Sequence, residues 1–166
     1  MATSRRLPIA RRVDKYRLYE EAVQSPDEFI PFVRRVYRRA HGTAPRLLKE
    51  DFCGTALIAC EWVRRDAEAR AWGVDLDPEP LAWARVHHLP RLGRRAGRVT
   101  FLQEDVLEVT RPRVDVVAAT NFSYFIFKER PALLAYLRSV YASLKPGGLY
   151  VCDLFGGTES MARVWE

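Results

Sequence analysis

Hydrophobic and polar positions follow a regular pattern along this chain, and the pattern changes after Pro45. Before that residue, two segments carry apolar residues at helical spacing: residues 14–24, and a second segment that runs to about Ala40 after Ser25–Pro26. After it, short apolar runs predict strands at 46–51, 69–75, 98–103, 113–120 and 148–154, and longer periodic segments predict helices at 55–66, 78–88 and 130–144. Strands that alternate with helices indicate a parallel α/β sheet with right-handed crossovers.

Turn and cap signals support these bounds. Asp77–Pro78 and Glu129–Arg130–Pro131 are typical of helix starts, and Lys145–Pro146–Gly147–Gly148 predicts a tight turn into the last strand. The apolar run 114–119 is typical of a central strand that is covered on both faces.

Candidate chemistry gathers where the first two predicted strands end. The first ends in Glu50 and Asp51, and the turn Cys53–Gly54–Thr55 leads into an apolar helix. This arrangement brings helix amides and carboxylates to one polar ligand at the carboxyl edge of a sheet. The second strand closes on Asp75, and an acid about 20 residues past a glycine turn is where ribose hydroxyls are bound. The two features predict a cofactor that contains a nucleoside.

With these motifs in place, the sequence resembles the class I S-adenosylmethionine-dependent methyltransferases over roughly residues 45–155. Glu50 and the 53–55 turn match the first motif, Asp75 matches the second-strand acid, and 103–106 and 144–149 match two further motifs. The resemblance implies a doubly wound, mostly parallel α/β sheet of five strands in the order 3-2-1-4-5, preceded by two N-terminal helices.

The resemblance implies S-adenosylmethionine as cofactor and S-adenosylhomocysteine as its product. Asp75 would hold the ribose, and Asp105 would accept from the adenine amino group. Two positions depart from the family motif: Phe52 stands where the first glycine belongs and Ala56 where the third does, which leaves the cofactor pose open. The residues that the resemblance assigns to the cofactor are Glu50, Asp51, Phe52, Cys53, Gly54, Thr55, Asp75, Leu76, Asp105, Val106, Asn121 and Phe122.

The methyl acceptor cannot be identified from the sequence, nor can a catalytic residue. Tyr16 and Tyr19 in the first helix, and Ser123 and Tyr124 after the fourth strand, are the candidate substrate contacts, although the two tyrosines could equally pack that helix onto the body. Residues 121–124 superficially resemble the N-P-P-Y motif of nitrogen methyltransferases. Both prolines are replaced, so nucleobase methylation by that mechanism is not expected.

The positive net charge raises the question of a nucleic-acid partner. The chain carries a formal charge of +6, almost all of it from arginine. Arg34, Arg35, Arg38 and Arg39 fall at helical spacing and could contact phosphates, but the solvated face of an amphipathic helix is the favoured interpretation. A non-catalytic cofactor- or RNA-binding module is therefore one alternative function. The other is an NAD(P)-dependent oxidoreductase, which lacks an intact G-x-G-x-x-G after the first strand.

Cysteine and histidine positions argue against disulfides and metals. The three cysteines form no C-x-x-C pair, and the three histidines have no ligand at metal spacing, so we expect a reducing compartment and no metal site. No apolar run approaches the ~20 residues of a membrane span, and we expect a cytoplasmic protein. The first dozen residues are basic and resemble a transit peptide in composition, but a disordered basic tail is favoured.

The expected domain organisation is a basic tail with the N-terminal helices over 1–44, followed by the cofactor-binding core over 45–166. The family core has seven strands, and only 13 residues follow Asp153, so the core is expected to be truncated. Strand 149–154 would then be an uncovered apolar edge, which predicts that the chain is a fragment or is completed by a partner, for example a second copy in a homo-oligomer.

Overall fold

The computed structural model describes residues 14–154 and 156, so the predicted basic tail lies outside the described residues. Two helices come first, α1 (Lys15–Val23) and α2 (Pro26–His41). Asp14 caps α1 by accepting from the amides of Tyr16 and Arg17, and Gly42 ends α2 in a left-handed conformation (φ 72°).

Five parallel strands form one sheet in the order β3-β2-β1-β4-β5, which confirms the predicted fold class. The strands are β1 (Leu47–Asp51), β2 (Arg70–Asp75), β3 (Val99–Gln103), β4 (Val114–Ala119) and β5 (Leu144–Cys152). All six residues of β4 are buried, as the apolar run 114–119 predicts for a strand covered on both faces.

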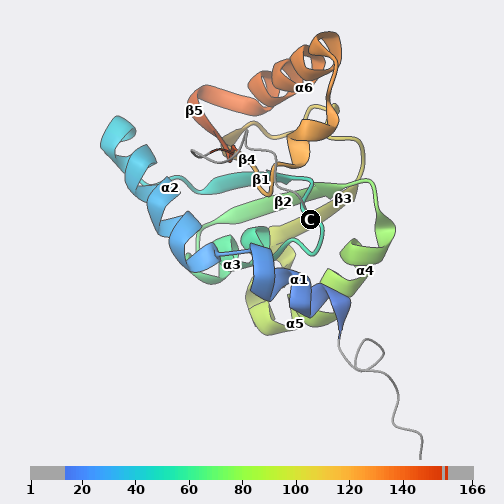
Figure 1. Ribbon diagram of the computed structural model, residues 1–166. Coiled ribbons are helices and arrows are strands. Elements are labelled where there is room, and N and C mark those ends of the chain that lie inside the picture. Colours follow the sequence, from blue (N-terminus) through green and yellow to red (C-terminus); the bar gives the residue numbers. More distant parts are fainter. Residues whose placement is uncertain (1–13, 155, 157–166) are drawn as a thin grey trace, which may run out of the picture.

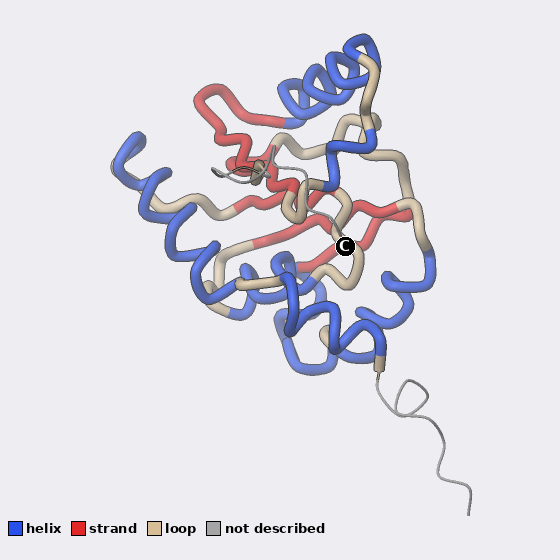
Figure 2. Tube along the Cα trace, viewed as in Figure 1, coloured by secondary structure: helices blue, strands red, loops and turns tan. Residues whose placement is uncertain are grey.

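Helices cover both faces of the sheet (Figures 1 and 2). The connections contain α3 (Leu57–Arg64), α4 (Pro78–His87), α5 (Leu89–Leu92) and α6 (Arg130–Ser143), with 3-10 turns at Gly93–Arg98 and Ser123–Ile126. Helices α2 to α5 lie on one face, where Ile30, Trp62 and Leu81 pack into a shared core with strand residues. On the other face, Tyr136 and Val140 of α6 pack against Val114 and Val117.

Two parts of the structure differ from the sequence prediction. Strand β5 begins at Leu144, so the predicted turn at Lys145–Gly148 lies inside it. The ladder with β4 shifts register there, pairing Val114 with Leu144 and then Val116 with Leu149, and this irregularity is what the Pro-Gly-Gly signal marks. Helix α5 and the 3-10 turn that follows it were not predicted, because Pro90 and Gly93 read locally as breakers.

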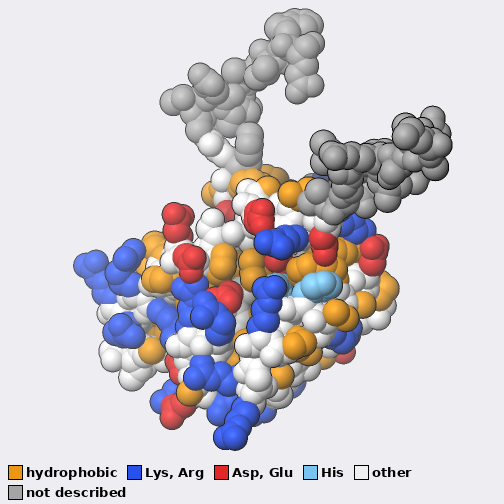
Figure 3. Space-filling model, turned by 90° about the horizontal axis from the view of Figure 1, so that it is seen from below, with side chains coloured by type: hydrophobic (Ala, Val, Ile, Leu, Met, Phe, Trp, Pro, Cys, Tyr) orange, Lys and Arg blue, Asp and Glu red, His pale blue; other side chains and the backbone are white. Residues whose placement is uncertain are grey.

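The arginines of α2 do not form one solvated face. Arg34 donates to Asp66 (3.2 Å) and to the main-chain oxygen of Trp62 (3.3 Å), and its guanidinium lies over the Trp62 ring. It therefore helps fasten α2 to α3, while Arg35, Arg38 and Arg39 are exposed. Lys and Arg side chains on the face seen from below are interspersed with Asp and Glu (Figure 3). Nucleic-acid binding stays a prediction.

Helix α1 has no buried residue. It is attached by polar contacts at its two ends: Asp14 accepts from the Trp83 indole (2.6 Å), and Glu20 lies 2.6 Å from Nε2 of the buried His88.

Among the residues that the structure describes, no helix combines the length and the apolar character needed to cross a membrane.

Candidate cofactor site

The acidic end of β1 directs its side chains to opposite faces of the sheet. Glu50 points to the α3 side, where its carboxyl accepts from the Ala59 amide at 2.7 Å. Glu50 thus supplies a hydrogen-bond acceptor to an amide in the first turn of α3. The N-cap residue, Ala56, has no side chain that could serve as this acceptor. Asp51 points to the α6 side, where it lies 2.9 Å from the Lys49 ammonium and accepts from the Tyr136 hydroxyl at 3.0 Å.

The turn after β1 is a series of left-handed residues. Phe52 (φ 55°), Gly54 (φ 51°) and Ala56 (φ 53°) all have positive φ, so the two residues that replace the family glycines keep a glycine-like backbone. The Phe52 ring packs toward Phe127 and Tyr136, with ring centroids 6.1 and 5.7 Å away. The left-handed backbone thus directs the bulky side chain toward the α6 layer.

The second strand approaches this turn closely. A Cβ added to Gly73 would lie 3.0 Å from the Cys53 sulfur and 3.1 Å from Cβ of Ala56, so a larger residue at position 73 would displace the turn. At the end of the same strand, the Asp75 carboxylate accepts from the amides of Gly54 (2.7 Å) and Asp77 (2.9 Å). These two main-chain amides therefore fix the position of the Asp75 carboxylate relative to the turn.

These elements enclose a cavity of about 580 Å³ at the carboxyl edge of the sheet. The lining residues come from α1, the two strand ends and the loop after β4: Lys15, Tyr16, Tyr19, Phe52, Gly54, Thr55, Asp75, Asp77, Pro80, Ser123 and Ile126. Seven of these were predicted from the sequence as cofactor or substrate residues. The sequence does not point to Lys15, Asp77, Pro80 or Ile126, and at Asp77 it predicts only a helix start.

Helix α1 forms one wall of the cavity. Lys15 pairs with Glu79 at 2.7 Å, and the Tyr19 hydroxyl accepts from the Asn121 side-chain amide at 3.1 Å. Tyr16 packs against Trp83 with ring centroids 5.7 Å apart. Both predicted tyrosines thus reach the cavity, and each also packs or bonds to the body.

The other predicted residues do not line this cavity. Four of them are buried nearby: Glu50, Asp51, Cys53 and Val106. Val106 packs in the α6-side core, and Leu76 is exposed. Asp105, after β3, accepts from the Leu107 amide at 2.9 Å. The Tyr124 hydroxyl donates to the Asp153 main-chain oxygen (3.1 Å). Asn121 and Phe122 form the turn after β4. Cofactor or substrate contact by these residues stays a prediction.

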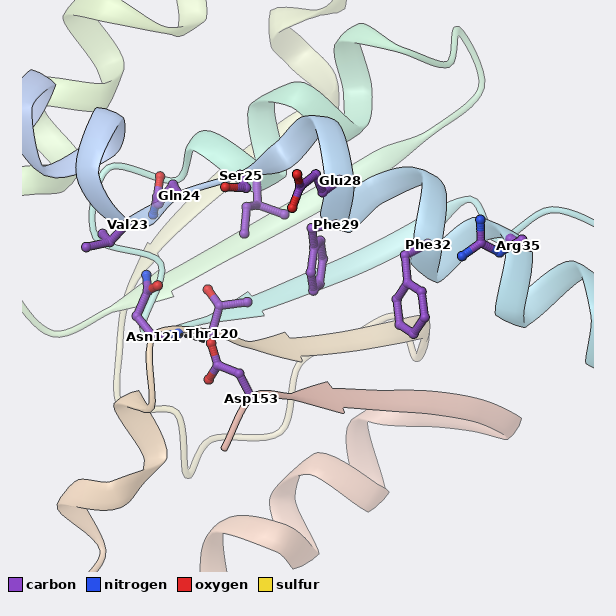
Figure 4. A pocket seen from close by; sticks show the side chains of 11 residues that line it. Val23, Gln24, Ser25, Glu28, Phe29, Phe32, Arg35, Thr120, Asn121 and Asp153 are labelled. Carbon is purple, nitrogen blue, oxygen red and sulfur yellow. Dashed lines mark hydrogen bonds between the residues drawn. The ribbon is translucent and has the colours of Figure 1, made fainter. Parts of the chain in front are cut away.

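A second cavity, of about 510 Å³, lies between α2 and the ends of β4 and β5 (Figure 4). Phe29 and Phe32 from α2 face Thr120, Asn121 and Asp153 across it (Figure 4). Sequence reasoning did not single out Asp153 as a site residue. Its place at the carboxyl end of a parallel strand is the signal that could have found it.

Burial changes the protonation of several groups around the turn. Burial raises the pKa of Glu50 to about 8, and the neighbouring Asp75 carboxylate adds to the shift. Burial also raises the pKa of the Cys53 thiol, which keeps it protonated and unreactive. The pKa of Tyr19 is raised by burial, and the carboxylates of Glu50, Asp75 and Asp153 contribute to the increase. Negative charge on these three carboxyl groups therefore opposes loss of the Tyr19 hydroxyl proton.

Over residues 14–154 and 156, no group of three or more His, Cys, Asp and Glu side chains is placed to hold a metal ion.

Comparisons with known proteins agree with this geometry. A family model described as a methyltransferase domain matches residues 52–148. The comparison with curated protein sequences gave no match. Among solved structures, the sugar N-methyltransferase KedS8 from Streptoalloteichus is similar with a TM-score of 0.70 and 22% identity, over 92% of this chain and 58% of that one.

Two further structures are similar. One is the amino pentose methyltransferase CalS10 from Micromonospora echinaspora, bound to S-adenosylmethionine (TM-score 0.68, 21% identity, 89% of this chain and 58% of that one). The other is a methyltransferase from Geobacter sulfurreducens in complex with S-adenosylhomocysteine (TM-score 0.57, 22% identity, 82% and 53%). At these identities the likeness shows the fold, and the chain spans less than two thirds of the length of these proteins.

The family match begins at the left-handed Phe52, runs through the Asp75 strand end and closes at the Pro-Gly-Gly segment of β5, more than half of the chain. The protein belongs to the methyltransferase-domain family.

Proposed function

We propose that this protein binds S-adenosylmethionine in the 580 Å³ cavity and takes part in transfer of its methyl group to an acceptor. One observation carries the proposal: the Asp75 carboxylate is held on the Gly54 amide, at the wall of the cavity, between the glycine turn and α1. A carboxylate fixed at that place suits two vicinal ribose hydroxyls, since each can donate a charge-assisted hydrogen bond.

The polar groups of the turn also fit a ligand there. The Thr55 hydroxyl is buried, lines the cavity and has no hydrogen-bond partner among the residues that the structure describes. A buried hydroxyl without a partner is costly, so a ligand atom that bonds to it would remove that cost. The close approach at Gly73 supports the same interpretation, because it keeps the turn tight beside the cavity.

When bound, the cofactor would supply a methyl group on a positively charged sulfur: the acceptor nucleophile would bond to the methyl carbon as the carbon–sulfur bond breaks, and S-adenosylhomocysteine would leave with that electron pair. The protein's contribution to such a reaction is proximity and in-line orientation. Tyr19 and Asn121, linked at 3.1 Å, join α1 to the loop after β4 and so hold two walls at a fixed separation. Ser123 donates to the Thr120 main-chain oxygen (2.8 Å), which shapes that loop on the predicted acceptor side.

Calorimetric titration of the protein with S-adenosylhomocysteine, NAD and a short RNA tests the proposal against both alternatives. We expect binding of S-adenosylhomocysteine alone. Binding of NAD in its place would favour the oxidoreductase, and binding of RNA alone would favour the non-catalytic module.

Asp75→Ala is expected to weaken S-adenosylhomocysteine binding by ~2–4 kcal/mol, the range for removing an acceptor from buried and charge-assisted donors. Asp75→Asn keeps an acceptor for the Gly54 amide but loses the charge, so its loss should be smaller. Glu68→Ala is the control, since Glu68 is an exposed acid at the opposite edge of the sheet. Unchanged binding in the Asp75→Ala protein would remove Asp75 from the site.

The adenine end of the cofactor gives a separate prediction. Asp105 still has one carboxylate oxygen beyond the one that accepts from Leu107. A carboxylate can accept from the adenine amino group but not from the carbonyl of hypoxanthine. The inosine analogue of S-adenosylhomocysteine should therefore bind at least ~tenfold more weakly, the equivalent of one hydrogen bond. Equal calorimetric affinities for the two analogues would show that Asp105 does not read the base.

A further inference from the structure

The loop after β4 begins with two consecutive residues in a left-handed conformation. Asn121 has φ 59° and Phe122 has φ 56°. Asparagine tolerates this region, but a bulky residue such as phenylalanine is strained there. Strain of this kind persists only where surrounding contacts impose it, and it concentrates at functional sites.

Asp153 supplies the contacts that impose it. Its carboxylate accepts from the Asn121 amide at 2.7 Å with one oxygen and from the Phe122 amide at 2.8 Å with the other. Its main-chain oxygen accepts from the Tyr124 hydroxyl at 3.1 Å. The neighbouring Cys152 pairs with Ala119 in the β4–β5 ladder, so Asp153 is brought beside this loop by the sheet itself (Figure 4). Charge-assisted bonds to two successive amides are suited to fix a turn.

The same turn is connected to the candidate cofactor cavity. The Asn121 side chain donates to Tyr19 on α1, and Tyr19 lines the cavity. Ser123 and Ile126, in the 3-10 turn that directly follows, line it as well. A change in the backbone at 121–122 would therefore move the wall formed by this loop and the link to α1.

We infer that Asp153 is a positioning residue: its carboxylate holds the Asn121–Phe122 turn in the left-handed conformation that completes the cofactor cavity. The inference rests on the proposed function. It assigns Asp153 no contact with the cofactor; its effect is transmitted through the turn.

Asp153→Asn tests the inference, with Asp115→Asn as a matched control. Asp115 also accepts from two successive amides, Arg46 and Leu47 (2.8 Å each), but with one oxygen and at the amino edge of the sheet. Its other oxygen accepts from the Lys145 ammonium at 2.7 Å, so Asp115→Asn loses stability through that pair. Both variants should unfold at lower temperature. Only Asp153→Asn should bind S-adenosylhomocysteine more weakly, by about tenfold, because an amide side chain can accept only one of the two bonds with its oxygen.

A second substitution separates positioning from a general structural role. Glycine adopts left-handed backbone without strain, so Phe122→Gly removes most of the need for Asp153. In the Phe122→Gly background, Asp153→Asn should lower the affinity for S-adenosylhomocysteine by no more than about threefold, against about tenfold in the wild type. The two effects are then non-additive, as expected for two residues in direct contact. If Asp153→Asn alone does not fold, this background carries the test, since the double variant should fold and bind within about threefold of Phe122→Gly.

The outcomes are distinguishable. A wild-type protein that does not bind S-adenosylhomocysteine overturns the proposed function. Wild-type binding with an equal affinity for Asp153→Asn overturns the positioning role. If Asp153→Asn lowers the affinity tenfold both with phenylalanine and with glycine at position 122, Asp153 does not act through the turn. A double variant that fails to fold would also contradict the inference.

Discussion

Replacing Lys49 with methionine is expected to lower the free energy of unfolding by about 3–5 kcal/mol, the range for removing one partner of a buried ion pair. The Lys49 ammonium lies 2.9 Å from the Asp51 carboxylate, and neither side chain is exposed. Over residues 14–154 and 156, the substitution leaves that carboxyl with the Tyr136 hydroxyl as its one partner. Burial already raises the pKa of Asp51 in spite of Lys49, so loss of the ammonium leaves a charge that the interior does not stabilise. Denaturant unfolding at neutral pH measures the change.

Lys15→Met is the matched control for this experiment. Lys15 forms an equally short pair with Glu79 (2.7 Å), but both side chains are about two thirds exposed, at 66% and 64%. Exposed pairs contribute little to stability, so this variant should unfold near the wild-type midpoint. Adding Asp51→Asn to Lys49→Met should recover part of the loss, because it removes the unpaired charge. A Lys49→Met protein as stable as the wild type would show that the buried pair contributes nothing.

Glu50→Gln is expected to remove a large part of the pH dependence of stability. Burial raises the pKa of Glu50 from 4.5 to about 8, so between these values the folded protein holds a proton that the unfolded chain has lost. The stabilisation from this group is complete below pH 4.5 and disappears as the pH rises to about 8. The wild type should lose on the order of 3–5 kcal/mol across this interval relative to the Glu50→Gln protein. The glutamine keeps a carbonyl oxygen for the Ala59 amide.

Unfolding free energies at several pH values, for both proteins, measure this difference. All other residues are the same in both proteins, so their contributions to the pH dependence cancel in the comparison. Parallel pH profiles for the two proteins would show that Glu50 is charged throughout.

The same titration bears on the cofactor. The ammonium group of S-adenosylhomocysteine would favour the charged form of a nearby carboxyl. If Glu50 acts on the cofactor as predicted, binding should release a proton below pH 8 and the affinity should rise toward that pH. Calorimetry in buffers of different ionisation enthalpy counts the released protons.

Much of the fold was predictable because it depends on local pattern. Apolar periodicity and cap residues place every strand of the sheet to within a few residues, except the start of β5. There the Pro-Gly-Gly signal was correctly read as irregular, but the irregularity is a register shift within the ladder, which depends on the partner strand.

The candidate site was predictable at the level of the backbone. Gly54, Thr55 and Asp75 meet at one cavity because strand ends in a parallel sheet share an edge. Which carboxylates remain for a ligand was not predictable. Glu50 and Asp51 are adjacent in sequence, yet Glu50 accepts from the Ala59 amide of α3 and Asp51 contacts Lys49 and Tyr136. The bond between Asp51 and Tyr136 joins residues 85 positions apart, so no local pattern could indicate it.

The sequence by itself determined the alternation of strands and helices, the acid at each of the first two strand ends and the glycine turn between them. Each of these follows from side-chain period, caps and turn residues that act over a few positions. Only the tertiary structure decided that the Phe52 ring packs toward the α6 layer on a left-handed backbone, and that Asp153 accepts from both amides of the Asn121–Phe122 turn. Both outcomes depend on contacts between distant segments, and such contacts select among backbone states that a local sequence leaves close in energy.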